Sequence, residues 1–441
     1  MEFSDTPGPY RHCVRFAVGR DSAPPGAFLV EAAARGSAPW VHEWKELRVQ
    51  PQRHRPGTGF TALHLVQPVD GGVATVVLDL VRAQVAAGTR VVVACPAGGP
   101  LAAEAARRGA EVREWRATRD PGPGLYEETR QVARLVEDVR PDLVHTHSAK
   151  AGLAGRLAVR GRVPTVFQPH AWSFEAVGGV TGHLARRWER WAARWTDRVV
   201  CVSEAERRTG ERAGVRASWA VVHNGVDLDR FRPPREPDPA SLRAALPLLA
   251  GLPATAPLVV CVGRLCRQKG QDILLRAWPL ITRQVPGARL VLVGDGPESS
   301  ALRDAAPPSV LFAGAVPDTT PWYRAADLVV LPSRWEGMAV APLEAMACGR
   351  PVVLSDVDGA RESLPPGREA LCLAPPEDPP ALAEAVSALL RDGPLREAVG
   401  GQGRRHVLSS YDVRQTARAI ADVYRDVAAV PRPERREPIP Q

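Results

Sequence analysis

Residues 327–355, DLVVLPSRWEGMAVAPLEAMACGRPVVLS, decide the fold class because they contain a complete strand–helix–strand unit. The apolar runs at 327–332 and 351–355 predict two short strands, and the stretch from about 340 to 348 predicts a helix between them. Apolar strands that alternate with helices indicate a parallel sheet that is covered by helices on both faces. Two glutamates fall in this unit, Glu336 in the turn after the first strand and Glu344 in the helix.

The same alternation runs along most of the chain in two series, which predicts two domains. Strands of the first series are expected at 62–66, 90–95, 142–147, 164–168, 198–203 and 219–224. Strands of the second series are expected at 258–263, 289–294, 309–314, 327–332, 351–355 and 370–374. At 441 residues the chain is also too long for one hydrophobic core. We therefore predict an α/β protein with two doubly wound, Rossmann-like domains whose sheets present their carboxyl ends to one central cleft.

Proline-rich and polar stretches set the expected boundaries of these domains. We expect a poorly organised leader at 1–58, a first domain at 59–235, a proline-rich linker at 236–257 and a second domain at 258–410. The last amphipathic stretch, 411–428, is expected to form a helix that crosses back onto the first domain. The remaining residues, 429–441, are expected to form a disordered tail.

Composition limits the class of protein and its partners. The hydrophobic and charged fractions of 45% and 24% are typical of a globular protein, and no apolar run reaches the length of a membrane-spanning helix. The first residues lack the apolar core of a secretory signal, and the seven cysteines form no C-x-x-C pair. We expect a cytoplasmic, metal-free protein with reduced thiols. The net charge of +8 favours anionic partners such as nucleotides, phosphates or an anionic membrane face, and no nucleic-acid-binding motif is visible.

Two segments have the composition of phosphate sites. Gly71 and Gly72 follow the first strand and open a helix, where free N–H groups and the helix dipole favour an anion; a simple tight turn explains them equally well. Arg264 and Lys269 follow Gly263 at the end of the second domain's first strand, as a diphosphate site requires. The alternative is a pair of solvated loop cations, although lysine occurs only three times in the chain.

The two glutamates allow two interpretations. In one, Glu336 is a helix-entry carboxylate and Glu344 faces solvent; in the other, both face a ligand, with Glu344 accepting hydrogen bonds from a vicinal diol such as that of a ribose. The backbone N–H groups of 338–340 open the same helix and could face a phosphate or a sugar.

Two further features are weaker signals. His170 follows the strand at 164–168 and so lies at a carboxyl edge, although an isolated loop histidine is more often structural. Trp188, Trp191 and Trp195 repeat at helical spacing among arginines. Packing of this tryptophan stripe in the core is the default interpretation, and a basic helix on a membrane surface is the alternative.

Several motifs in order along the chain resemble those of the family 4 glycosyltransferases, which have the GT-B fold. They are DGGVA, HTHSAKAGLAGRLA, VCVSEAE, VVHNGVDLDRF, VGRLCRQKG, LVGDGPE and EGMAVAPLEAMACGRPVV, and the resemblance covers about residues 60 to 428. It implies transfer of a sugar from a nucleotide-sugar donor, a UDP- or GDP-sugar, with retention of configuration and without metal or another cofactor. The acceptor would be a glycan, a lipid-linked molecule or a small molecule, with peripheral contact to the inner membrane face as an open alternative. An epimerase or a glycogen-type phosphorylase on the same fold is the first rival, and a non-catalytic two-domain binding protein is the second.

The resemblance also implies roles for individual residues. Arg264 and Lys269 would hold the donor diphosphate, Glu336 the donor sugar and Glu344 the ribose. His170 would contact the sugar near its C6 hydroxyl, and Val316 would contact the base through backbone groups. The full expected set is catalytic His170, Arg264, Lys269 and Glu336, and donor-binding Gly71, Gly72, Gly263, Arg264, Lys269, Val316, Glu336, Gly337, Met338, Ala339, Val340 and Glu344. Met338 and Ala339 stand where many relatives have a bulky residue followed by glycine, so the identity of the donor sugar stays open.

Overall fold

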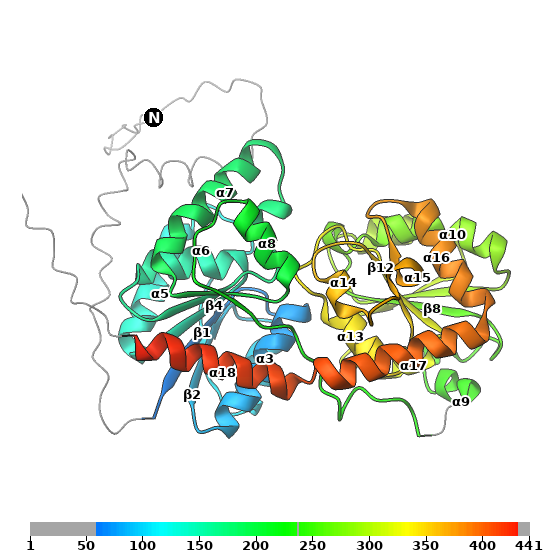
Figure 1. The fold of residues 1–441 in the computed structure, drawn as a ribbon, viewed down its shortest axis with the longest axis horizontal. Helices are drawn as coiled ribbons and strands as arrows, with labels where there is room; N and C mark the ends of the chain where they lie inside the picture. Colours follow the sequence, from blue (N-terminus) through cyan, green and yellow to red (C-terminus); the bar gives the residue numbers. More distant parts are fainter. Residues whose placement is uncertain (1–58, 236–237, 431–441) are drawn as a thin grey trace, which may run out of the picture.

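The computed structural model describes residues 59–235 and 238–430, which form two α/β domains side by side (Figure 1). Each domain contains one parallel sheet with helices on both faces, so the predicted fold class is confirmed. The expected leader at 1–58 and residues 431–441 of the expected tail lie outside the described residues.

The first sheet has seven strands in the order β3-β2-β1-β4-β5-β6-β7, and all of its pairs are parallel. Its apolar strands are buried on both faces, as helix-covered parallel strands require; all six residues of β1 are buried. The strands are β1 Thr61–Val66, β2 Arg90–Cys95, β3 Glu111–Glu114, β4 Leu143–His147, β5 Thr165–Gln168, β6 Arg198–Cys201 and β7 Trp219–Val221.

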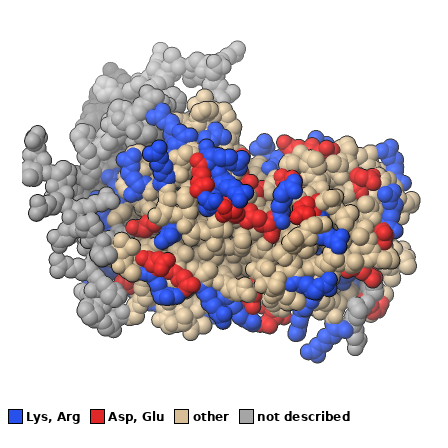
Figure 2. Space-filling view, in the orientation of Figure 1, with Lys and Arg blue, Asp and Glu red and all other residues tan. Residues whose placement is uncertain are grey.

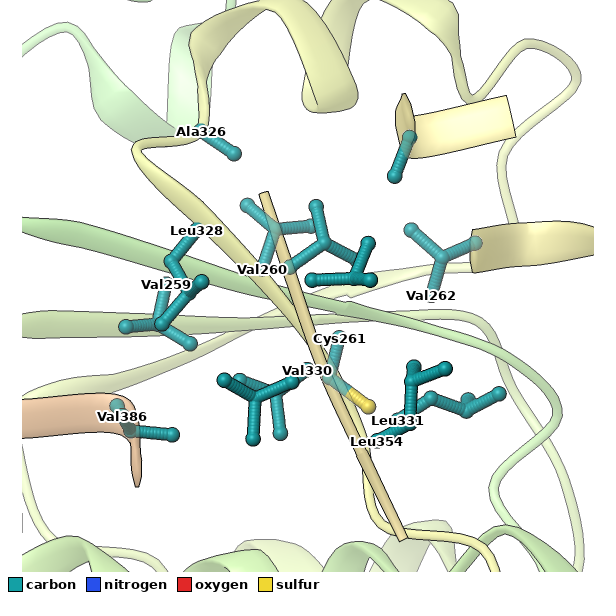
Figure 3. Close-up of a cluster of buried hydrophobic side chains, with 14 of the residues drawn as sticks. Val259, Val260, Cys261, Val262, Ala326, Leu328, Val330, Leu331, Leu354 and Val386 are labelled. Atoms are coloured by element: carbon teal, nitrogen blue, oxygen red, sulfur yellow. The ribbon is translucent and has the colours of Figure 1, made fainter. Parts of the chain in front are cut away.

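The second sheet has six strands in the order β10-β9-β8-β11-β12-β13, again all parallel. Valine and leucine side chains of its central strands form the core of this domain with helix residues such as Val386 (Figure 3). The strands are β8 Leu258–Val262, β9 Arg289–Val293, β10 Val310–Gly314, β11 Leu328–Leu331, β12 Val352–Ser355 and β13 Leu373–Ala374.

Amphipathic helices cover both sheets. Helix α5, for example, buries Leu125, Val132, Val136 and Val139 on one face because these residues recur every three to four positions. The helices of the first domain are α3 Gly71–Ala86, α4 Pro100–Arg107, α5 Leu125–Val139, α6 Ser148–Val159, α7 Gly179–Ala192 and α8 Glu204–Arg212. Those that follow are α9 Pro239–Ala244, α10 Gln271–Gln284, α11 Ser299–Ala305, α12 Thr320–Ala325, α13 Val340–Ala347, α14 Ala360–Ser363, α15 Glu369–Cys372, α16 Pro379–Arg391, α17 Gly393–Ser410 and α18 Val413–Ala429.

Helix α18 leaves the second domain and runs along the first (Figure 1). Its apolar face, with Ile420, Val423 and Val427, packs in one cluster with Ala62 of β1 and Leu80 of α3. The helix predicted to cross back therefore does so, and it packs against the first sheet.

Three details differ from the sequence interpretation. Strand β3 was not predicted, because its residues, EVRE, are polar and lie at the edge of the sheet. The strand predicted at 370–374 is wrong for its first three residues, which end the short helix α15; only Leu373–Ala374 pairs with β12. The segment expected to be a linker contains helix α9 and the fully buried Leu249, so it packs on the second domain.

Candidate functional site

The carboxyl ends of the two sheets face each other, and the candidate residues lie in the loops between them. Gly71 follows β1 and His170 follows β5 in the first domain. Lys269 follows β8 and Glu336 follows β11 in the second domain. The structure thus brings the predicted residues of both domains to one boundary, where open α/β sheets bind their ligands.

Lys269 and Glu336 form an ion pair at this boundary. Nζ of Lys269 lies 2.5 Å from Oε1 of Glu336, which also accepts a hydrogen bond of 2.7 Å from the Ser333 hydroxyl. The Glu336 side chain is 9% exposed and that of Lys269 is 21% exposed. The pair is therefore largely removed from solvent, where attraction between the charges is stronger than in water. Oε2 of Glu336 has no hydrogen-bond partner among the described residues.

Arg264 lies beside this pair at the end of β8. Its side chain is half-buried and makes no hydrogen bond or ion pair with the described part of the chain. Gly263 borders the Lys269 stem, since a Cβ on this glycine would lie 3.6 Å from Cγ of Lys269. All of the N–H donors of the Arg264 guanidinium are therefore available to a ligand. The Lys269 ammonium, in contrast, already donates one hydrogen bond to Glu336.

The loop from Gly337 to Ala339 touches the first domain directly. The Ser203 hydroxyl donates to the Gly337 carbonyl at 2.7 Å, and the Asn224 amide donates to the Met338 carbonyl at 2.7 Å. A Cβ on Gly337 would lie only 2.9 Å from the Ala171 nitrogen, so this close approach requires glycine. The two domains are therefore in contact at the candidate donor loop.

Two helix N-termini meet across the same boundary. Helix α3 begins at Gly71, whose φ of 70° favours glycine, and α13 begins at Val340 after the extended residue Ala339. A Cβ on Gly72 would lie 4.0 Å from Cγ2 of Val340. The free N–H groups at both helix starts create positive potential here, which suits a negatively charged ligand.

Glu344 is buried within α13 and does not face solvent, so the solvent-facing interpretation is wrong. Its Oε2 accepts a hydrogen bond of 2.6 Å from the Tyr323 hydroxyl. Burial raises the pKa of the Glu344 carboxyl to about 7, although the Tyr323 hydrogen bond and the positive charge of Arg230 lower it. Oε1 has no hydrogen-bond partner among the described residues. Val316, after β10, is half-buried against the core of the same domain.

His170 lies in a left-handed turn, with φ of 55°, and its side chain is half-buried. Its Nε2 lies 3.2 Å from Nδ1 of His147, a fully buried residue of β4. Burial lowers the pKa of His170 to about 3, which keeps the ring neutral near pH 7. His170 is thus connected to the interior of the first sheet.

Several residues of this site had no predicted role. Tyr323, Ser333, Ser203 and Asn224 supply the hydrogen bonds described above, and Glu206 accepts from the Ala171 N–H at 2.6 Å. Ser203, Glu206 and Asn224 fall within the motifs VCVSEAE and VVHNGVDLDRF, which were the only sequence signal for them.

The described residues contain one group that could hold a metal ion. One ring nitrogen from each of His64, His145 and His147 lies within 4.8 Å of the other two, and all three side chains are fully buried. The three histidines lie on strands β1 and β4 of the first domain, and Glu336 is not a member of this group.

A small and a large cavity bear on the position of the site. The smaller one lies at the candidate site and is lined by Ser333, Glu336, Ala339 and the turn at Asp358 and Gly359. The larger one is lined by Thr61, Arg90, Asp142 and Tyr424, at the opposite, amino end of the first sheet. Only the smaller cavity belongs to the boundary that the predicted residues share.

Two parallel-sheet domains in contact at their carboxyl edges, with cations, buried carboxylates and helix N-termini between them, define the GT-B class of nucleotide-sugar enzymes. Residues 70–230 match the model described as Glycosyltransferase Family 4, and residues 256–392 match the model described as Glycosyl transferases group 1. The chain belongs to glycosyltransferase family 4, and it is a glycosyltransferase rather than an epimerase.

Individual proteins agree with this assignment. The chain is 33% identical to the lipopolysaccharide core biosynthesis mannosyltransferase LpsB of Rhizobium meliloti, over 54% of this chain and 68% of LpsB. It is 37% identical to the GDP-mannose-dependent alpha-(1-6)-phosphatidylinositol monomannoside mannosyltransferase of Mycobacterium tuberculosis, over 52% of this chain and 62% of that enzyme. The crystal structure of HepE from Anabaena in complex with UDP and glucose shares the fold, with a TM-score of 0.70 and 24% identity, over 82% of this chain and 98% of HepE.

Proposed function

We propose that this chain transfers a hexose from a UDP- or GDP-sugar to a glycan, lipid-linked or small-molecule acceptor, with retention of configuration and without metal or another cofactor. The observation that carries the proposal is the Lys269–Glu336 ion pair beside the unpartnered Arg264. Departure of the nucleoside diphosphate builds negative charge on its phosphates, and cations held in a closed cleft stabilise that charge. The names of the mannosyltransferases and the UDP of HepE support the two donor classes.

Each residue of the boundary has a part in this proposal. Arg264, Lys269 and the N-termini of α3 and α13 hold the diphosphate. Oε2 of Glu336, which is free of protein partners, accepts a hydrogen bond from a hydroxyl of the donor sugar. Oε1 of Glu344 accepts from the ribose, and Val316 lies beside the base. His170 contacts the sugar from the first domain.

A panel of donors tests the proposal. Thermal unfolding is measured with UDP-, GDP-, ADP- and TDP-sugars, because a ligand at 100 times its dissociation constant adds about 2.7 kcal/mol to the free energy of unfolding. We expect a UDP- or GDP-sugar to stabilise the protein, and proton NMR of the product to show the anomeric configuration of the donor. Stabilisation by none of the four donors, or an inverted product, would overturn the proposal.

The metal-independent mechanism predicts that chelation leaves activity intact. Turnover is compared before and after treatment with EDTA and desalting, and we expect the same kcat because Lys269 and Arg264 supply the positive charge. A loss of turnover that only manganese or magnesium restores would contradict this mechanism.

Glu344→Gln is expected to weaken binding of the nucleoside diphosphate by about 1–3 kcal/mol, because an amide accepts two ribose hydroxyls less well than a carboxylate. Glu336→Gln is the matched control, since the product carries no sugar for Glu336 to bind. Calorimetry with UDP and GDP measures both variants. An equal loss of affinity in the two variants, or none in Glu344→Gln, would contradict the separate roles.

The raised pKa of Glu344 gives a second readout of the same role. With a pKa of about 7, Glu344 is mostly protonated at about pH 6 and mostly ionised at about pH 8, so the affinity of the wild type should rise over that window. Titration of the diphosphate itself changes the affinity of the wild type and of Glu344→Gln equally. The further rise in affinity that ionisation of Glu344 causes should be absent from Glu344→Gln. Because the folded-state pKa is raised from 4.5, this group also makes the free energy of unfolding fall as the pH rises from 4.5 to about 7. Identical pH dependence of affinity in the two proteins would remove Glu344 from the ribose site.

Peripheral contact of the first domain with the cytoplasmic face of a membrane is a further part of the proposal. Val177 and Val180 at the start of α7 are 38% and 73% exposed, and Arg187, Arg190 and Arg194 follow on exposed positions. Figure 2 shows blue Lys and Arg side chains gathered over the part of the first domain where α7 lies. Exposed apolar side chains beside arginines suit an anionic lipid surface. No helix within 59–235 or 238–430 is long and apolar enough to cross a membrane.

A further inference from the structure

Four side chains form a continuous hydrogen-bonded chain from the interior of the first domain to the candidate site. Nε2 of His64 lies 2.8 Å from Oε1 of Gln84, and Nδ1 of His64 lies 3.0 Å from Nε2 of His147. Nδ1 of His147 lies 3.2 Å from Nε2 of His170. The rings of neighbouring histidines are nearly parallel, with interplanar angles of 14° and 25°. Both ring nitrogens of the two inner histidines are therefore occupied.

The fold holds this chain in place. His64 of β1 is paired with His145 of β4, so His64, His145 and His147 lie on one face of the sheet. Helices α3 and α18 cover that face and supply Gln84 and Tyr424. His64 and His147 are fully buried, and burial lowers the pKa of each, so both rings are neutral.

A neutral imidazole has one N–H and one lone pair, so the hydrogen bonds of the chain must all run in one direction. The structure orients the carboxamide of Gln84 with its oxygen toward Nε2 of His64. A carboxamide oxygen only accepts, so in this orientation Nε2 of His64 carries its hydrogen. Nδ1 of His64 then accepts from Nε2–H of His147, and Nδ1 of His147 accepts from Nε2–H of His170. The remaining nitrogen of His170, Nδ1, is left with a lone pair and has no partner among the described residues.

We propose that Gln84, through His64 and His147, fixes the tautomer of His170 so that its Nδ1 is a hydrogen-bond acceptor for a hydroxyl of the donor sugar. The inference rests on the proposed transferase function, because it assigns the chemistry of one contact in that site. His170 is followed by Ala171, whose nitrogen lies 2.9 Å from the position of a Cβ on Gly337, so the histidine turn borders the donor loop. Gln84, His64 and His147 are positioning residues. A donor sugar that presents only hydrogen-bond acceptors to Nδ1 of His170, such as a carboxylate, is expected to bind less well.

Gln84→Leu tests the direction of the chain. Without the terminal acceptor, an N–H at Nε2 of His64 would be buried without a partner, so the hydrogen bonds should reverse and place a hydrogen on Nδ1 of His170. Tyr424→Phe is the matched control. It removes the 2.7 Å hydrogen bond to His145 and the contact of the Tyr424 hydroxyl with Gln84, but it keeps the carboxamide oxygen of Gln84 that accepts from His64.

The tautomers are read directly from long-range proton–nitrogen NMR spectra of protein labelled with nitrogen-15 histidine, with signals assigned by single histidine substitutions. We expect a hydrogen on Nε2 and none on Nδ1 for His64, His147 and His170 of the wild type and of Tyr424→Phe. We expect a hydrogen on Nδ1 of His170 in Gln84→Leu. This variant should also lose about tenfold in kcat/KM for the donor sugar that the wild type uses, with unchanged affinity for the nucleoside diphosphate.

A hydrogen on Nδ1 of His170 in the wild type overturns the proposal, even if Gln84→Leu fails to fold. An unchanged His170 tautomer in a folded Gln84→Leu overturns the role of Gln84. Stoichiometric metal bound by His64, His145 and His147, detected by elemental analysis, also overturns it because the metal would occupy the nitrogens of the chain. The spectra do not depend on turnover, so a failure of the transferase proposal would appear separately as the absence of donor binding.

Discussion

Lys269→Ala is expected to lower kcat by about 10- to 150-fold, because a charge-assisted contact to the departing diphosphate is worth about 1.5–3 kcal/mol in the transition state. The same substitution is also expected to destabilise the protein. It leaves the nearly buried carboxylate of Glu336 with Ser333 as its one remaining partner, and an uncompensated charge of this kind costs about 1–3 kcal/mol. Initial rates and urea denaturation measure the two effects on one preparation.

Two further variants separate catalysis from stability. Arg264→Ala should lower kcat to a similar degree with little change in stability, since its side chain has no partner in the described chain. Lys269→Ala combined with Glu336→Gln should regain stability, because it removes the unpaired charge, but should not regain turnover. Near-normal turnover of Lys269→Ala or of Arg264→Ala would remove the diphosphate role from that residue.

Trp188→Ala is expected to cost about 3–5 kcal/mol of stability, as large-to-small substitutions in a well-packed core do. Trp188 is 8% exposed and belongs to the cluster that includes Val159 and Ala192. Its ring centroid lies 5.5 Å from that of Trp191 and 5.6 Å from Cζ of Arg156, which forms a buried ion pair with Glu189. Urea denaturation measures the loss, and we expect the variant to be unfolded or nearly so.

Val180→Ser is the control for a membrane role of the same helix. Val180 is 73% exposed, so its substitution should leave stability unchanged and reduce sedimentation with vesicles that contain anionic lipid. If Trp188→Ala instead kept the stability of the wild type and lost vesicle binding, Trp188 would belong to the membrane face and not to the core.

The tryptophan stripe shows what helical periodicity in the sequence can and cannot predict. Its helical spacing predicted a buried face, and Trp188 is buried while Trp191 and Trp195 are half-buried against the same cluster. The spacing does not predict which tryptophan is most buried. The burial of each one depends on how closely α7 packs against α6 and the strands of the first sheet.

The sequence by itself determined the two sheets, most of their strands and the loops that carry the candidate residues. Buried parallel strands are apolar along their whole length and helices repeat every three to four residues, so both signals lie within a few neighbouring positions. Glu336 and Lys269 could be placed at strand ends for the same reason. The edge strand β3 was missed because its residues, EVRE, are polar, and the apolar run at 370–374 predicted a strand that is too long because residues 370–372 end helix α15.

Only the tertiary structure decided how the chemical groups are paired. Lys269 and Glu336 are 67 positions apart. Gln84, His64, His147 and His170 come from helix α3, strand β1, strand β4 and the loop after β5. The burial of Glu344 beneath Tyr323 likewise depends on the packing of α12 against α13. Hydrogen bonds, ion pairs and the pKa shifts that burial causes act through space over a few ångströms, so they are fixed by which elements pack together, and local sequence pattern does not contain that information.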